Sequence, residues 1–234
     1  ILTGSLTASQ KRKTLEELST GEIDLAVGTH ALLSEGVEFK KLGLVITDEQ
    51  HRFGVAQRAK LAAKGINPHI LVMSATPIPR SLALILYGDL DVSILDQLPP
   101  GRKPVETYAI NSEKRERAFN YVKKHIDEGR QAYIVCPLVE NGEESDLASA
   151  TEYVEKLAKG AFKGYKLGLL HGRMKPAEKE KVMDMFAKNE ISVLVSTTVI
   201  EVGVDVPNAA LIVIENAERF GLAQLHQLRG RVGR

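Results

Sequence analysis

Short apolar runs alternate with helix-compatible runs along the whole chain, and this alternation constrains the fold more than any other feature. The apolar runs are a few residues long and rich in branched side chains, as in central strands of a parallel sheet covered on both faces. The chain is therefore predicted to be an α/β protein with parallel sheets. In the first half we expect strands at residues 23–28, 42–47, 69–73 and 92–95, and helices at residues 9–18 and 80–86.

A proline-rich segment divides this pattern into two halves. Residues 98–104 have the sequence Leu-Pro-Pro-Gly-Arg-Lys-Pro, a composition that is typical of a linker. We predict a partial first lobe at residues 1–98, a linker at residues 99–104 and a second lobe at residues 105–234. The second lobe is expected to hold strands at 105–110, 131–138, 167–170, 193–196 and 210–215, helices at 113–128, 147–158 and 176–188, and an exposed acidic loop at 141–145.

Two carboxylates, Asp48 and Glu49, close the apolar run at residues 42–47. Open α/β sheets bind ligands at the carboxyl ends of their strands, which is where this pair is expected. An aspartate there can hold the magnesium ion that bridges nucleotide phosphates, and a neighbouring glutamate can orient or deprotonate the attacking water. Taken alone, the dipeptide would favour a solvated loop or a helix cap. The other motifs of the chain reverse that preference.

Two arginines, Arg231 and Arg234, follow an amphipathic segment at residues 221–228. If that segment is helical, both guanidinium groups can point from its end toward one place. Arginine suits phosphate binding because its charge is fixed and its planar fork matches phosphate oxygens. The alternative is a basic tail that binds nucleic acid through charge alone.

Four motifs resemble those of superfamily-two helicases and follow in the same order. They correspond to motifs II, III, V and VI and are Asp48-Glu49-Gln50-His51, residues 74–80 (Ser-Ala-Thr-Pro-Ile-Pro-Arg), residues 196–207 (Ser-Thr-Thr-Val-Ile-Glu-Val-Gly-Val-Asp-Val-Pro) and residues 227–234 (Gln-x-x-Gly-Arg-x-Gly-Arg). Within the superfamily, residues 48–55 and 170–174 resemble the RecG type, which acts on branched DNA. The nearest rival is the transcription-repair coupling translocase, which is similar at residues 224–227 but usually has Asp-Glu-Glu-Gln where this chain has Asp-Glu-Gln-His.

The resemblance implies two RecA-like lobes, the first truncated on its N-terminal side, with ATP and Mg²⁺ as cofactors and branched or duplex DNA as partner. For the intact protein it implies Holliday-junction branch migration and replication-fork regression in recombination and repair. The chain has no Gly-Lys dipeptide and hence no Gly-x-x-x-x-Gly-Lys-Ser/Thr phosphate loop, which the resemblance places upstream of Ile1. For this chain alone, a nucleic-acid-binding module without turnover is the other expectation.

The resemblance also assigns roles in the nucleotide site. Arg234 is implied to be the arginine finger and Arg231 its phosphate-binding neighbour, while Asp48 is the implied Mg²⁺ ligand. Gln227 and His51 are implied to lie between the lobes and to link the nucleotide state to lobe closure. Either polar side chain can instead satisfy local backbone groups.

Further residues are assigned by the remaining motifs. Ser74, Thr76 and Arg80 follow a predicted strand, and the resemblance to motif III implies that they couple hydrolysis to DNA movement. They also fit an ordinary strand-to-turn transition that is stopped by prolines. Gly203 and Asp205 fit a nucleotide-facing turn, in which the glycine allows close approach and the aspartate reaches a ribose or an arginine.

Candidate DNA-binding residues follow strand ends in both lobes. Hydroxyl and backbone N–H groups at such places suit nucleic-acid phosphates and fix the register without reading the base sequence. A threonine there can equally cap a helix, and a glycine there can simply make a turn. The candidates are Thr29, His30, His171, Gly172, Arg173, Thr197 and Thr198.

Composition limits the remaining possibilities. With 31 basic and 30 acidic residues the net charge is +1, so nucleic-acid binding has to come from local patches. The single cysteine, Cys136, is expected in the core, which excludes a disulfide framework and fits a reducing compartment. No histidine lies at metal-ligand spacing from another histidine or from Cys136, so a zinc site is not expected. Without a leader or a membrane-spanning run, we expect a cytoplasmic protein, with a single-strand-binding protein as a candidate partner of the intact form.

Overall fold

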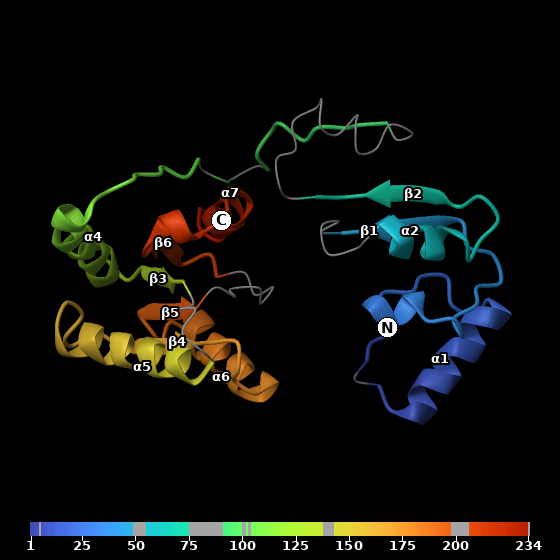
Figure 1. Ribbon diagram of the computed structural model, residues 1–234, viewed down its shortest axis with the longest axis horizontal. Helices are drawn as coiled ribbons and strands as arrows, with labels where there is room; N and C mark the ends of the chain where they lie inside the picture. The colour runs from blue at the N-terminus through green and yellow to red at the C-terminus, as the bar shows by residue number, and fades with distance from the viewer. Residues whose placement is uncertain are drawn as a thin grey trace. The chain divides into compact units, whose positions relative to one another are not determined.

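The computed structural model describes residues 1–4, 6–48, 55–74, 91–99, 102, 104–137, 143–197 and 206–233. The chain divides into two compact units, Ile1–Pro77 and Ile78–Arg234, each with its own sheet (Figure 1). The lobe boundaries predicted at residues 98 and 105 stay predictions.

The first unit begins with a capped helix and ends with a pair of strands. Thr7 caps α1 (Ala8–Thr20): its hydroxyl accepts a hydrogen bond from the Gln10 N–H at 3.3 Å, and the Gln10 side chain accepts one from the Thr7 N–H at 3.0 Å. Gly21 ends the helix in the left-handed region, with φ at 79°. The elements that follow are η1 (His30–Leu33), β1 (Leu44–Thr47), α2 (Val55–Ala62) and β2 (His69–Val72), and β1 pairs with β2 in parallel.

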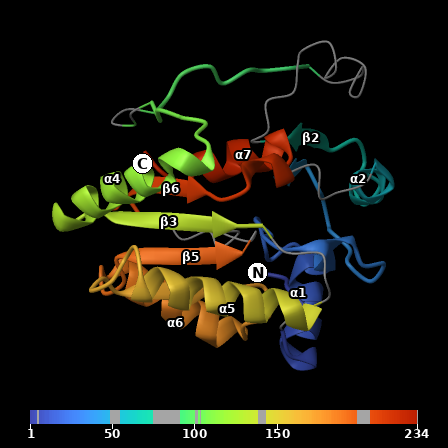
Figure 2. The same cartoon turned by 60° about the vertical axis from the view of Figure 1, so that its left-hand side comes forward.

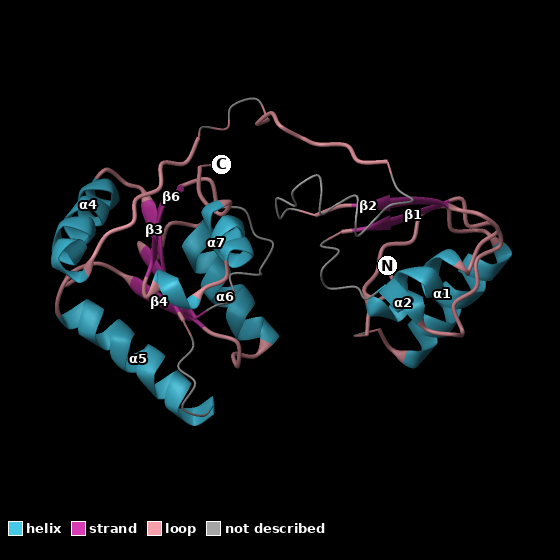
Figure 3. Ribbon diagram, turned by 45° about the horizontal axis from the view of Figure 1, so that its top comes forward, coloured by secondary structure: helices cyan, strands magenta, loops and turns pink. Residues whose placement is uncertain are grey.

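The two faces of the β1–β2 pair differ in burial. Val45 and Thr47 are both 6% exposed, whereas Leu44 and Ile46 are both 53% exposed. Successive strand residues point to opposite faces, so one face of β1 is covered within the chain and the other is open. Figure 3 shows α1 and α2 on the same side of the pair. The prediction that this strand is covered on both faces is therefore wrong for this chain.

The second unit is an α/β domain built on a parallel sheet. The strands described in it are β3 (Gln131–Cys136), β4 (Leu167–Leu170), β5 (Val193–Thr197) and β6 (Ala209–Ile214), in the spatial order β4-β5-β3-β6. The helices described in it are α4 (Arg115–Asp127), α5 (Glu143–Lys159), α6 (Pro176–Ala187) and α7 (Leu222–Arg229), with short 3₁₀ turns η3 (Ser112–Lys114) and η4 (Ala217–Arg219).

Helices cover both faces of this sheet. In Figures 2 and 3, α4 and α5 lie on one face and α6 and α7 on the other. Alternate residues of β3 enter the two apolar cores. Ala132 and Ile134 pack with the residues of α4 and α5. Tyr133 and Val135 pack with those of α6 and α7. The second unit is thus a three-layer α/β/α domain.

One buried polar residue ties the layers together. The Gln131 side chain is fully buried, and its Nε2 donates to the carbonyls of Phe186 at 2.6 Å and Ile191 at 2.7 Å. Its Oε1 accepts a hydrogen bond from Asn208 Nδ2 at 3.1 Å. Because its polar atoms are paired, burial of this amide is compatible with stability. Gln131 joins the start of β3 to the end of α6.

Most predicted helices and strands are confirmed, and several predictions in both units are wrong. β4, β5 and α6 form within one residue of their predicted ends. Among the described residues, those at 92–95 and 105–110 form no strand, and the strand predicted at 23–28 is reduced to one bridge between Leu2 and Gly28. The acidic loop predicted at 141–145 is wrong from Glu143 onward, because α5 begins there. The helix predicted at 80–86 lies outside the described residues. None of the described helices has the length and apolar character needed to span a bilayer.

Candidate nucleotide and nucleic-acid sites

Asp48 and Ser74 lie beyond neighbouring strand ends at the same edge of the first sheet. Thr47 aligns with Val72 across the β1–β2 pair, and the Met73 N–H donates to the Thr47 carbonyl at 2.8 Å, which extends the pairing by one residue. Both Asp48 and Ser74 are exposed. The structure therefore brings a residue of motif II and a residue of motif III to one edge, as the parallel arrangement predicts.

Eight predicted site residues lie outside the described residues. They are Glu49, His51, Thr76, Arg80, Thr198, Gly203, Asp205 and Arg234. Their assigned roles stay predictions.

Thr29 and His30 are positioned by a close backbone approach. A Cβ at Gly28 would lie 2.3 Å from the Leu2 carbonyl oxygen, so the pairing of Leu2 with Gly28 requires glycine. The Thr29 N–H then donates to the Leu2 carbonyl at 3.3 Å. Thr29 precedes η1, but its side chain makes no capping hydrogen bond. Both Thr29 and His30 are exposed, so capping does not account for the Thr29 hydroxyl.

His171 and Thr197 lie at the carboxyl ends of neighbouring strands in the second unit. Leu170 of β4 aligns with Ser196 of β5, so the two candidates share one edge of the sheet. Thr197 is 5% exposed, whereas His171 is half-buried. Desolvation lowers the pKa of the His171 imidazole, and the nearby positive charges of Lys179 and Arg173 lower it further.

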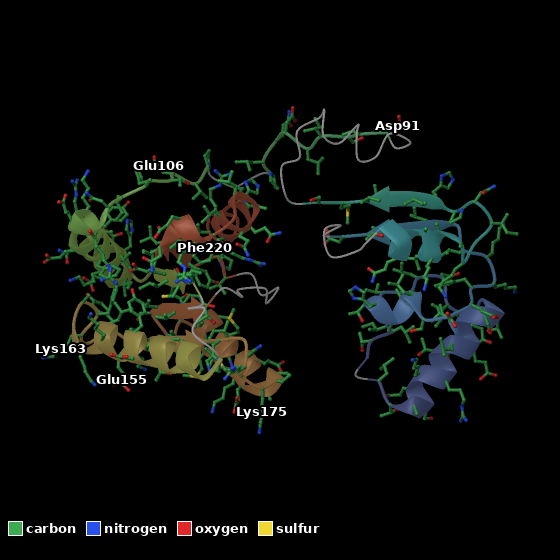
Figure 4. The ribbon with its side chains drawn as sticks, viewed as in Figure 1. Asp91, Glu106, Glu155, Lys163, Lys175 and Phe220 are labelled. Atoms are coloured by element: carbon green, nitrogen blue, oxygen red, sulfur yellow. The ribbon has the colours of Figure 1, made fainter. Side chains whose placement is uncertain are left out.

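A lysine that the sequence did not indicate completes this edge. Lys179 Nζ on α6 donates to the Gly172 carbonyl at 2.7 Å, and the Met174 N–H donates to the His171 carbonyl at 3.3 Å. Lys179 thereby fixes the turn that presents Arg173. α6 begins at Pro176, directly after Lys175, which Figure 4 labels, so Lys179 lies in the first turn of the helix. The sequence did offer one signal for Lys179. It is a basic residue one turn into a helix that follows a candidate loop.

Gln227 and Arg231 belong to α7 and the turn that follows it. α7 ends at Arg229, so the helix predicted before the arginine pair is confirmed. Leu228 and Val232 are 7% and 2% exposed, whereas Gln227 and Arg231 are half-buried. The apolar side chains anchor the segment in the α6/α7 core and leave the two polar side chains at its surface.

A polar cluster, unforeseen from the sequence, lies at the end of β6. Arg115 Nε and Nη2 donate to Glu215 Oε1 at 3.1 and 3.0 Å, and the Tyr153 hydroxyl donates to the same oxygen at 2.8 Å. Arg115 Nη2 also donates to the Tyr153 hydroxyl oxygen at 2.8 Å. Burial raises the pKa of the neighbouring Cys136 thiol to about 12, and the negative charge of Glu215 acts in the same direction. In the part of the chain that the structure describes, no three His, Cys, Asp or Glu side chains gather as a metal site.

Two helicase families match the chain. The DEAD/DEAH box helicase family matches residues 2–85, and the helicase conserved C-terminal domain matches residues 113–234. Curated proteins named ATP-dependent DNA helicase RecG, from Synechocystis sp. and Thermotoga maritima, are each 55% identical over 234 residues, which is 100% of this chain. The match covers 28% and 30% of those proteins, so the chain spans less than a third of their length.

Solved structures agree with these matches. A structure of RecG bound to a three-way DNA junction is 53% identical, with a TM-score of 0.73, and the match covers 100% of this chain and 30% of that one. A structure of the helicase MrfA bound to DNA is 18% identical, with a TM-score of 0.65, and the match covers 100% of this chain and 36% of that one. At that identity the second likeness shows the fold alone. The predicted fold class, α/β with parallel-sheet RecA-like domains, is confirmed.

Proposed function

We propose that this chain, which belongs to the RecG type of superfamily-two helicases and carries their conserved C-terminal domain, is part of the ATP-driven motor of a protein that remodels branched DNA. The observation that carries the proposal is the 53% identity, over the whole chain, to a RecG protein in complex with a three-way DNA junction. The match to RecG proteins over the whole of this chain favours this function over the transcription-repair coupling translocase.

The carboxylate edge of the first sheet supports a nucleotide site. Asp48 is an exposed carboxylate directly beyond β1, beside Ser74 beyond β2. Mg²⁺ is usually held by one or two carboxylates, by water and by substrate phosphates, so the single described carboxylate fits this ion. When bound, Mg²⁺ would neutralise phosphate charge. Asp48 would hold the ion, and Glu49 would accept the proton of the attacking water.

The arginine segment, which is residues 227–234, supplies the other half of the proposed site. Arg231 is half-buried in the turn after α7, and the buried Val232 fixes the backbone that follows it. An arginine held by packed neighbours can stabilise charge that develops on a transferred phosphoryl group without reorganising first. We assign Arg234 this finger role and Arg231 the binding of phosphate oxygens. Gln227 lies one helical turn before Arg231, and we assign it the link between the nucleotide state and lobe closure.

Two strand-end clusters are proposed to contact the DNA backbone. Thr29 and His30 present exposed polar groups in the first unit. His171, Arg173 and Thr197 lie at one sheet edge in the second unit. Such contacts position the protein on any sequence, as a translocating motor requires. The coupling roles of His51, Ser74, Thr76 and Arg80, the association with a single-strand-binding protein, the cytoplasmic location and the lack of turnover by this chain alone stay predictions.

Two substitutions in the full-length protein test the nucleotide site. Glu49→Gln is expected to keep ATP binding and nearly abolish DNA-stimulated hydrolysis, because the amide keeps the shape but cannot accept a proton. Asp48→Ala is expected to weaken Mg²⁺-dependent ATP binding as well. Asp24→Ala, which removes an exposed carboxylate elsewhere in the first unit, is the control and should change neither. Wild-type ATPase kinetics in both test variants would remove the carboxylates from the proposed mechanism.

A further inference from the structure

The linker segment makes a direct contact with the arginine segment. Arg102, within the predicted linker, donates from Nη2 to the Gly230 carbonyl oxygen at 3.0 Å, and the bond is partly buried. The two residues are 128 positions apart in the chain. The donor is a charged guanidinium, and hydrogen bonds from charged donors are stronger than those between neutral groups.

This contact completes the restraint of one peptide unit. The Gly230 carbonyl and the Arg231 N–H belong to the same planar peptide group. The N–H donates to the Leu228 carbonyl at 3.0 Å, and the carbonyl accepts the Arg102 hydrogen bond at 3.0 Å. The peptide group that leads into Arg231 is therefore held at both ends. Its rotation, which would swing the Arg231 side chain, has to break one of these bonds.

The linker side of the contact is itself anchored. The Arg102 N–H donates to the Pro99 carbonyl at 3.1 Å. Three residues later, Val105 packs against the apolar core that contains Leu228 and Val232. Arg102 thus lies three residues before a side chain that packs on the same core as Leu228 and Val232.

We propose that Arg102 is a positioning residue that holds the Gly230–Arg231 peptide, and with it the Arg231 side chain, in the orientation needed for phosphate binding. This inference rests on the proposed function of the arginine segment. Arg102 lies within the second unit, in the predicted linker, and a change in linker conformation that withdraws it would release the Gly230–Arg231 peptide. The linker would then contribute to the orientation of Arg231.

The test uses the full-length protein and two independent measurements. Hydrogen exchange of the Arg231 and Val232 amides is measured without nucleotide or DNA. The kcat of DNA-stimulated ATP hydrolysis, the KM for ATP and the DNA affinity are measured in parallel. The variants are Arg102→Ala, Arg102→Lys, Arg231→Ala and the Arg102→Ala/Arg231→Ala pair. Arg117→Ala, which removes an exposed arginine of α4, is the matched control.

In Arg102→Ala we expect faster exchange at the two amides, a kcat lower by about tenfold and a higher KM for ATP, with DNA affinity nearly unchanged, because a misoriented Arg231 binds the phosphate oxygens less well. Arg102→Lys, which keeps a donor, should recover part of these effects. In the Arg231→Ala background, Arg102→Ala should add almost nothing, because it acts through that side chain. Arg117→Ala should resemble the wild type.

Three outcomes separate the inference from the function on which it rests. Unchanged exchange in Arg102→Ala would overturn the positioning role. A loss of kcat that multiplies fully with that of Arg231→Ala would also overturn it, because the two residues would then act independently. If Arg231→Ala leaves kcat intact, the proposed role of Arg231 fails, and the exchange measurement alone decides whether Arg102 restrains the peptide.

Discussion

At the scale of single residues, Glu215 organises the polar cluster at the end of β6. Its side chain is 19% exposed and that of Arg115 is 40% exposed. Glu215→Ala removes the shared acceptor of Arg115 and Tyr153 and should lower the free energy of unfolding by about 1–2 kcal/mol, a value reduced for the exposure of the arginine. Urea unfolding measures the change. Glu155→Ala, which breaks a solvent-exposed pair with Lys159, is the control and should have almost no effect.

Cys136 should be unreactive in the folded protein at neutral pH. The thiolate is the reactive form, and burial raises the pKa of this thiol to about 12. Alkylation followed by peptide mass spectrometry should therefore be slow at pH 8 in the native protein and fast after unfolding in urea. A pKa that is higher in the folded than in the unfolded state stabilises the fold at low pH. That contribution should decline as the pH rises from about 9 toward 12. Rapid native labelling at pH 8 would contradict the burial argument.

Residues that carry motifs could be predicted from the sequence, whereas their supporting partners could not. Asp48, Ser74 and Arg231 were found because each follows an apolar run or a recognisable pattern. The partner of Arg102 is 128 positions away, and that of Arg115 is 100 positions away. A side chain that supports a site through a distant backbone or carboxylate leaves no periodic signal in the sequence, so the tertiary fold is needed to find it.

At the scale of elements, Leu228, the buried apolar residue of α7, should contribute most to holding this helix in place. It is 7% exposed within the α6/α7 core. Leu228→Ala should destabilise the second unit by roughly 2–4 kcal/mol, because it removes buried methyl groups and leaves a cavity. Leu222→Ala in the same helix is the matched control, since Leu222 is 86% exposed. Equal midpoints of urea unfolding for the two variants would contradict the assigned orientation of α7.

Elements with a clear pattern of apolar residues and a buried face could be predicted from the sequence. Exposed apolar runs led to wrong strand predictions. β5 is buried at every position, and its apolar run predicted it almost to the residue. Leu25 and Val27 form a similar run but are 77% and 59% exposed, and only a single bridge forms there. A strand exists only where a neighbour accepts its backbone hydrogen bonds, and local composition does not report that neighbour.

At the scale of the whole molecule, the two units differ in what each contributes within this chain. The second unit has apolar cores on both faces of its sheet and carries the arginine segment. The first unit has a small core around Leu2, Leu18 and Val37 and carries the carboxylate edge. In the proposed motor, each unit carries residues that are assigned to ATP hydrolysis, the carboxylates in the first and the arginines in the second.

The most direct test of this account is the ATPase rate of Arg234→Ala at saturating DNA, measured in the full-length protein beside a salt titration of DNA binding. Arg219→Ala, at an exposed position before α7, is the control. An arginine finger acts on charge that develops in the transition state, so turnover should fall on the order of a hundredfold or more while the salt dependence of binding stays the same. Unchanged turnover, with the slope of log K against log salt reduced by about one phosphate contact, would instead identify a basic tail and contradict the proposed motor site.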